Sequence, residues 1–236
     1  MTGSPAVGGA PAEPVGAEVG ARGSRVAYAG LLFSALFLVA WLLLRDSPSF
    51  DATDAQLTDY YADTDRRRAA ILAGLYVIPL AGIAFIWFMS ALRDRYMRTV
   101  HGENVILSTA HVVSGSLVVV SLFTLATVEL AVAWMAEKGS SFDVDGARSL
   151  LALGEASSEI MALRSAAVFV GVSASRAVRS GLFPRAFGVV SFLVAAALLF
   201  VYEAVPVVSL LFPAWVAGSA VLILVRRRSL ATAEQA

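Results

Sequence analysis

The chain has 236 residues, of which 58% are hydrophobic and 15% are charged, and its formal net charge is zero. Soluble domains carry about 25% charged residues, so this composition indicates a membrane protein. Zero net charge excludes nucleic-acid binding through an overall basic field. A sequence without cysteine excludes disulfides, iron–sulfur clusters and thiol chemistry.

Residues 1–25 are rich in Gly, Pro and Ala and offer little to bury, so we expect a disordered cytoplasmic tail. Residues 26–44 carry no charge. A helix needs about 20 apolar residues to cross the ~30 Å hydrocarbon core of a bilayer. The apolar part of a cleaved signal peptide is only about 7–15 residues long. The run therefore predicts an uncleaved first membrane span.

The loop after this span contains a helix signal. The sequence Thr-Asp-Ala-Gln at 53–56 has the pattern of a capping box, in which the first and fourth side chains cap the start of a helix. Leu57, Tyr60 and Tyr61 follow at helical spacing. Tyrosine is frequent at membrane surfaces, so we expect a short amphipathic helix lying on the outer interface.

Further apolar stretches follow along the chain. Lipid offers no hydrogen-bond partner to backbone groups, so each such stretch must be helical. We predict an all-α fold, a polytopic transmembrane helix bundle over 26–228, with a cytoplasmic tail at 229–236. The six predicted spans are about 26–44, 69–92, 105–136, 150–175, 186–203 and 207–225.

The distribution of arginine predicts the orientation, because Arg and Lys collect in cytoplasmic loops. An N-terminus inside the cell puts most of the basic residues inside. The main exception is the run of three arginines at 66–68, which then lies outside. We expect a multi-pass protein of the cell (inner) membrane with both termini cytoplasmic.

A few charged side chains fall within the predicted spans. Such residues are costly in lipid, so they usually face a partner or a cavity. The candidate intramembrane polar cluster is Glu129, Glu159 and Arg164. Weaker candidates are Glu155, placed near the interface, Glu203 at the outer end of span five, and His111 near the inner boundary.

Depth along the helices suggests a specific ion pair. At 1.5 Å per residue, Glu129 and Arg164 fall at similar depths in the outer half of consecutive spans. We expect these two side chains to pair, with Glu203 as the alternative partner of Arg164. Such a pair could serve only to hold the helices in register, as buried ion pairs often do.

The sequence offers little material for catalysis. Two histidines are too few for a histidine-based metal site, and no phosphate-binding or dinucleotide-binding glycine pattern occurs in a strand–helix context. Ser114 and Ser116 lie near His111, but no nucleophile-elbow pattern surrounds them. We therefore predict no catalytic residues, no metal and no cofactor.

Three stretches carry a resemblance to a known family. They are Leu-Thr-Asp-Tyr-Tyr-Ala-Asp at 57–63 leading through the arginines at 66–68, Trp-Phe-Met-Ser-Ala-Leu-Arg at 87–93, and Arg-Ser-Gly-Leu-Phe-Pro-Arg-Ala-Phe-Gly at 179–188. The last is similar to a Gly-x-Leu-Pro-Arg-Trp-Leu-Gly pattern before span five. The whole chain resembles a family of uncharacterised bacterial six-pass membrane proteins, described as a domain of unknown function. The resemblance implies no activity.

These observations favour a non-catalytic membrane protein that acts through partners, as an accessory subunit or a sensor. The alternative is a small transporter or proton-coupled carrier that uses Glu129, Glu159 and Arg164. A third reading is a membrane-embedded enzyme, which would need a pocket containing His111 and a glutamate. The expected partners are the lipid bilayer and either another membrane protein or further copies of this chain, but no nucleic acid.

Overall fold

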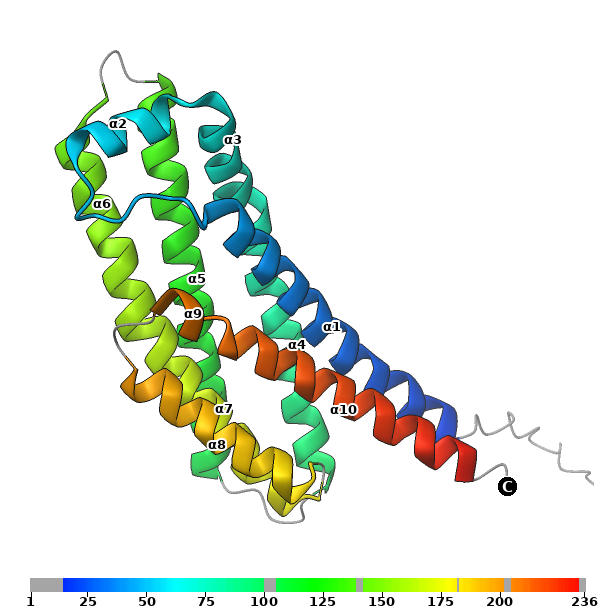
Figure 1. Cartoon of the computed structure of the whole chain (residues 1–236). Helices are drawn as coiled ribbons and strands as arrows, with labels where there is room; N and C mark the ends of the chain where they lie inside the picture. Colours follow the sequence, from blue (N-terminus) through cyan, green and yellow to red (C-terminus); the bar gives the residue numbers. More distant parts are fainter. Residues whose placement is uncertain (1–14, 100–104, 139–141, 182, 202–204, 234–236) are drawn as a thin grey trace, which may run out of the picture.

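The computed structural model describes residues 15–99, 105–138, 142–181, 183–201 and 205–233, and within these ranges every regular element is a helix (Figure 1). The all-α prediction is confirmed. Four helical stretches are long and apolar enough to cross a membrane, and two further apolar helices are shorter, which indicates a membrane protein. The long stretches are Arg25–Leu44, Thr64–Tyr96, Val105–Lys138 and Val144–Arg179, and the shorter ones are Arg185–Phe200 and Leu211–Arg226.

Both ends of the predicted bundle differ from the structure. Helix α1 spans Val15–Leu44, so residues 15–25 are helical and do not form the expected disordered tail, while 1–14 lie outside the described residues. Helix α10 spans Leu211–Ala233 and continues past the predicted end of the last span at 225. Extending an existing helix needs no new nucleus, so an anchored membrane helix can propagate into a sequence that would not form a helix alone.

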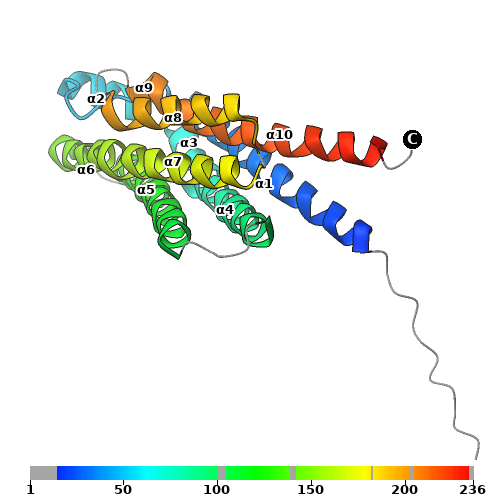
Figure 2. The same ribbon diagram turned by 90° about the horizontal axis from the view of Figure 1, so that it is seen from below.

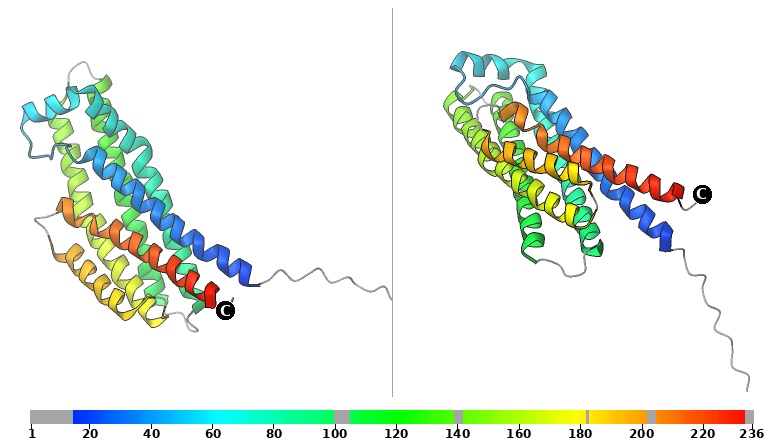
Figure 3. Two further views of the ribbon diagram at one scale, coloured as in Figure 1. Left: turned by 45° about the vertical axis from the view of Figure 1, so that its right-hand side comes forward. Right: turned by 60° about the horizontal axis from the view of Figure 1, so that its bottom comes forward.

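The long helices pack around α5 (Val105–Lys138). One neighbour is the helical stretch made of α3 (Thr64–Leu72), η1 (Ala73–Val77) and α4 (Ile78–Thr99). The other is made of α6 (Val144–Ala156), η2 (Ser157–Leu163) and α7 (Arg164–Arg179). Helix α7 lies between α5 and α8 (Arg185–Phe200), as Figure 2 shows. Helix α1 packs against both α4 and α10 (Figure 3).

The segments η1 and η2 are π-helical turns inside two of the long helices. A π-turn has a wider hydrogen-bonding pattern than an α-helix, so it shifts the direction of all the side chains that follow. Both turns pack against α5. Angular positions deduced from a straight α-helix therefore fail beyond residues 73 and 157.

Four phenylalanines fill the middle of the bundle, one each from α1, α4, α7 and α10. Their ring centroids lie 5.0 Å apart for Phe33 and Phe85, 5.1 Å for Phe85 and Phe169, and 5.3 Å for Phe85 and Phe212. All four side chains are buried. Such aromatic pairs are worth about 0.5–1.5 kcal/mol each beyond their burial, so this phenylalanine cluster helps to hold four helices together.

The predicted amphipathic helix is present as α2 (Asp54–Ala62), and its capping box is formed. The Thr53 N–H donates to Gln56 Oε1 over 2.9 Å, and the Gln56 N–H donates to Thr53 Oγ1 over 3.3 Å. Its apolar residues Leu57, Tyr60 and Tyr61 are buried against α3, α5 and α6. The expectation that these tyrosines lie at a lipid surface was therefore wrong.

The reason is that α5 and α6 extend far enough to offer the helix a protein surface. Val132 and Ala133 of α5, with Ala147 and Leu151 of α6, form a second apolar cluster under α2. Figure 1 shows α2 lying across the ends of these helices. We call this end of the bundle the cap end.

The close contact between η1 and α5 can be tested at Gly74. A Cβ atom at Gly74 would lie 2.7 Å from the backbone oxygen of Ala126, whereas one at Gly171 would meet only Ala195 Cβ at 3.9 Å. We expect Gly74→Ala to lower the free energy of unfolding by about 1–3 kcal/mol relative to the matched control Gly171→Ala. Replacing Gly by Ala raises the helix propensity by about the same amount at both positions, so this contribution cancels when the two variants are compared. Equal apparent melting temperatures in detergent would contradict the contact.

Candidate ligand-binding cavity

A cavity of about 640 Å³ lies at the cap end, between α1, α4, α5, the α6–η2–α7 stretch and α10. Typical small-molecule sites have volumes of about 300–1,000 Å³, so this cavity is large enough for a ligand. Ser209 and Phe212 line it where the α8–α10 connection ends. Figure 1 shows that α9 (Val205–Val208), in this connection, lies well short of α2 along the long helices. The shorter helices thus leave space beneath the cap end.

The cavity changes from apolar to charged along its length. On α5 its lining runs from Val118 to Glu129, which spans about 16 Å at 1.5 Å per residue. On α1 it runs from Phe37 to Leu44, and the charged Arg45 follows directly, again towards the cap end. The lining of the α6–η2–α7 stretch has glutamates towards the cap end and Ala166 at the far end. The deep part of the cavity is therefore apolar and its cap end is charged.

Three glutamates line this charged end: Glu129, Glu155 and Glu159. The Glu129 side chain is only 6% exposed, and its Oε2 atom has no hydrogen-bond partner among the residues that the structure describes. Glu155 lies close enough for its carboxylate to interact electrostatically with Glu129, and the two groups carry the same sign of charge. Glu155 itself accepts a hydrogen bond from the Phe50 N–H over 2.9 Å. Two members of the predicted polar cluster, Glu129 and Glu159, thus share one cavity with Glu155.

The third member, Arg164, is directed elsewhere. Its Nη1 donates over 2.8 Å to the carbonyl oxygen of Leu198 in the last turn of α8. Neither an ion pair nor a hydrogen bond joins the described side chains of Glu129 and Arg164, so the expected pair was wrong. The last carbonyls of a helix lack partners within it and attract cations, which gives Arg164 a partner in α8. The alternative partner, Glu203, lies outside the described residues.

His111 lies towards the opposite end of α5 and is fully buried. Its Nδ1 is 3.0 Å from Ser173 Oγ, and its Nε2 is 3.3 Å from the Met89 carbonyl oxygen. Its ring packs 4.6 Å from that of Phe169. Both ring nitrogens therefore have partners from α4 and α7, and His111 is not part of the cavity lining. The pocket that a histidine–glutamate enzyme would need is not formed by these residues.

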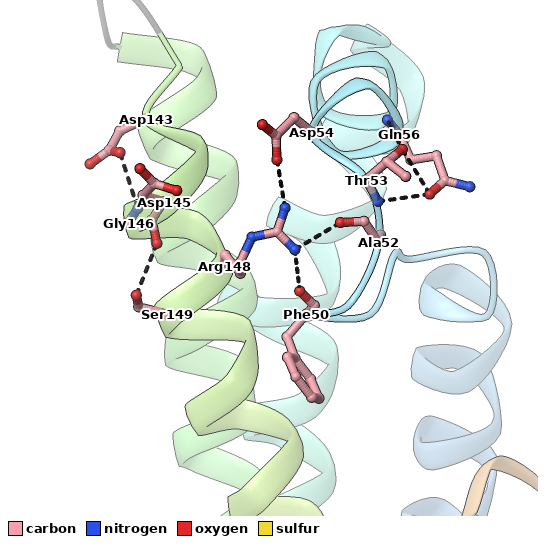
Figure 4. Close-up of polar contacts among 10 residues, drawn as sticks. All are labelled: Phe50, Ala52, Thr53, Asp54, Gln56, Asp143, Asp145, Gly146, Arg148 and Ser149. Carbon is pink, nitrogen blue, oxygen red and sulfur yellow. Dashed lines mark hydrogen bonds and ion pairs between the residues drawn. The ribbon is translucent and has the colours of Figure 1, made fainter.

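The sequence did not single out the segment 45–53, which covers part of the cavity. Arg148 of α6 holds it by Nη1 hydrogen bonds to the carbonyl oxygens of Phe50 (2.6 Å) and Ala52 (2.8 Å), as Figure 4 shows. Its Nη2 pairs with Asp54 Oδ1 over 2.6 Å. Arg148 and Glu155 are seven residues apart, two helical turns, so both face this segment. That spacing was readable in the sequence, but nothing in it indicated which backbone the two side chains would meet.

Polar groups of the cap end crowd together near Glu129. Burial raises the pKa of the Tyr60 and Tyr61 phenols, and the negative charge of Glu129 raises both further. The Ser47 hydroxyl is buried beside both phenols and acts on their pKa in the opposite direction. At the start of α3, the backbone N–H groups of Arg66 and Asp65 lower the pKa of Asp63, which caps that helix.

The comparisons with other proteins add no function. No family model, no curated protein and no solved structure matches the chain. The resemblance to a bacterial six-pass family therefore rests on the three sequence stretches alone. In the ranges that the structure covers, no three His, Asp or Glu side chains lie close enough together to hold a metal ion. The lining of the cavity is thus the feature from which function is argued.

The role of Arg148 can be measured by hydrogen exchange. We expect Arg148→Gln to speed exchange of the Phe50 and Ala52 amides by about fivefold, because partly exposed ionic contacts are worth up to about 1 kcal/mol. This expectation is tested by measuring hydrogen exchange by mass spectrometry on peptides that cover residues 45–53. Arg68→Gln is the matched control, since Arg68 is an exposed arginine at the same end. Similar exchange in both variants would show that Arg148 does not hold the segment.

Proposed function

We propose that the chain is a six-pass protein of the bacterial inner membrane. The four long apolar helices are supplemented by α8 and α10, whose outward faces are apolar. Val189, Phe192 and Leu193 of α8 and Val221 of α10 are well exposed, as expected of side chains that contact lipid. The apolar part of each shorter helix is 16 residues, about 24 Å, and modest local thinning of the bilayer accommodates such a length.

We propose that the cap end faces outwards and both termini face the cytoplasm. Arginines gather at the opposite end, where α4 and α7 end and α8 begins, and the positive-inside rule puts this end in the cytoplasm. The arginines at this end include Arg25, Arg93, Arg95, Arg176, Arg179, Arg185 and Arg226. The three arginines at 66–68 lie at the cap end, where Asp63 pairs with Arg66 at 3.7 Å.

Single cysteines test this orientation cleanly, because the chain has no cysteine of its own. We expect Asp51→Cys to react with a membrane-impermeant maleimide in intact cells. Ser4→Cys and Gln235→Cys should react only after the cells are permeabilised. Labelling that puts residues 4 and 235 on opposite sides would contradict an even number of crossings.

Within this arrangement we propose that the protein binds a small molecule in the cavity and acts through partners, as a sensor or an accessory subunit. The observation that carries the proposal is a cavity of about 640 Å³ that combines apolar walls with a buried, unpartnered carboxylate. Convergent polar groups in a largely apolar pocket are the usual marks of a ligand site. His111 lies outside this cavity, which is why we propose binding and not catalysis.

A carrier is the second candidate, since Glu129 and Glu159 line a cavity that extends into the bundle. A carrier must also open to the other side of the membrane. Phe212 lines the deep end of the cavity and belongs to the phenylalanine cluster, whose members are buried. Passage would require this cluster to separate, whereas sensing would not. This packing favours a sensor or accessory subunit over a carrier.

Filling the cavity tests the proposal. Leu125 lines it, whereas Leu117 of the same helix is exposed on the outside of the bundle. We expect Leu125→Trp to abolish saturable binding of 6-phenylhexanol to the protein in lipid nanodiscs, measured by calorimetry with empty nanodiscs subtracted. Leu117→Trp should bind as the unchanged protein does. Equal binding by both variants, or no saturable binding at all, would refute a ligand site here.

A further inference from the structure

The polarity of the cavity indicates the chemical class of its ligand. We propose that the site recognises an amphiphilic ammonium, a protonated primary amine carried on an apolar chain, with the ammonium at Glu129 and the chain directed towards Val118. This inference rests on the cavity being the binding site proposed above.

The charges at the cap end of the cavity favour a cation. Glu129, Glu155 and Glu159 line it, against one arginine, Arg45. The Arg45 guanidinium pairs with Asp46 at 3.6 Å, and both side chains are more than half exposed to solvent. Glu155 has one oxygen occupied by the Phe50 N–H. An anionic headgroup would therefore meet like charges, and a cationic one would meet opposite charges.

Hydrogen bonding favours an ammonium over a cation without donors. Glu129 Oε2 is a buried acceptor without a donor in the described chain, and such a group costs about 1–3 kcal/mol if it stays unsatisfied. A primary ammonium has three N–H donors. Ser47 Oγ, which also lines the cavity, is a buried oxygen that can accept another of them. One ligand group thus meets both a carboxylate and a hydroxyl of the cavity lining.

The shape of the cavity requires an apolar chain on that headgroup. Below Glu129 the α5 lining is Val128, Leu125, Leu122, Ser121 and Val118. The Ser121 hydroxyl is occupied by the Leu117 carbonyl oxygen of its own helix, at 2.9 Å. Phe37 and Trp41 of α1 add aromatic surface on the opposite wall. A small inorganic cation would leave this space unfilled, and the carboxylates are not grouped closely enough for a metal site in the described chain.

Three probes of one size and different charge test the class of ligand. They are 6-phenylhexylamine, 6-phenylhexanol and 6-phenylhexanoate, titrated by calorimetry into the full chain in phosphatidylcholine nanodiscs. We expect the amine to bind at least tenfold more tightly than the alcohol, and the carboxylate to bind least. Glu129→Gln should reduce the affinity for the amine to that for the alcohol while leaving the alcohol unchanged, which also shows that the cavity is intact. Glu137→Gln, an exposed acid of the same helix, is the control and should change nothing.

The outcomes separate this inference from the proposed function. If the alcohol binds as tightly as the amine, or if Glu129→Gln keeps the preference for the amine, the ammonium inference is overturned and the cavity remains a binding site. If none of the three probes binds saturably, the proposed function fails as well. Adding phosphatidylethanolamine to the nanodiscs distinguishes two sources of the ammonium. Weaker apparent binding of the amine then identifies a lipid headgroup as the occupant, and unchanged binding identifies a free amine.

Discussion

The structure depends on one constraint, which is that a polar group surrounded by lipid or packed side chains must find its partner within the protein. Most polar side chains of the long helices find such a partner close by. Thr124 and Thr127 return hydrogen bonds to carbonyl oxygens one turn earlier, and His111 is held by Ser173 and Met89. Arg164 reaches the end of α8. Glu129 departs from this pattern, because one of its buried oxygens has no partner in the described chain.

The position of Glu129 follows from unequal helix lengths. Helices α5 and α6 extend beyond the ends of α8 and α10 at the cap end, so no shorter helix fills the space beside Glu129 (Figure 1). The segment 45–53 covers that space, since Arg45, Ser47, Pro48 and Ser49 line the cavity. The covering segment is held by hydrogen bonds from α6, through Arg148 and Glu155. The cover is thus held by hydrogen bonds from charged side chains and by the Arg148–Asp54 ion pair, whereas the floor of the cavity is aromatic.

This division gives the two ends of the cavity different mechanical properties. The phenylalanine cluster at the floor joins four helices by close ring contacts, and separating it would expose buried aromatic surface. The cover depends on a few partly exposed contacts, which are individually weak. Displacing the cover therefore costs much less free energy than separating the rings of the floor. Such a site suits recognition from the cap end of the bundle.

Several features could be predicted because they depend on the local sequence. Long uncharged runs must be helical in lipid, which located the apolar parts of the long helices, although α1 begins at Val15, eleven residues before the predicted span at 26. The capping box at Thr53 and Gln56 is formed by residues three apart and needs no tertiary contact. The glutamates were identified as candidates because a charge in an apolar run is costly wherever it points.

What these residues contact could be decided only by the tertiary structure. The π-turns at η1 and η2 rotate the side chains beyond them, so the direction of Arg164 could not be deduced from α-helical spacing. The tyrosines of α2 were assigned to lipid because the sequence does not reveal that α5 and α6 extend beneath them. The cavity itself arises from the lengths of helices far apart in the chain. The sequence alone thus determined which segments are helical and which side chains are costly to bury, since both are local properties. Only packing decided which of those side chains face one another.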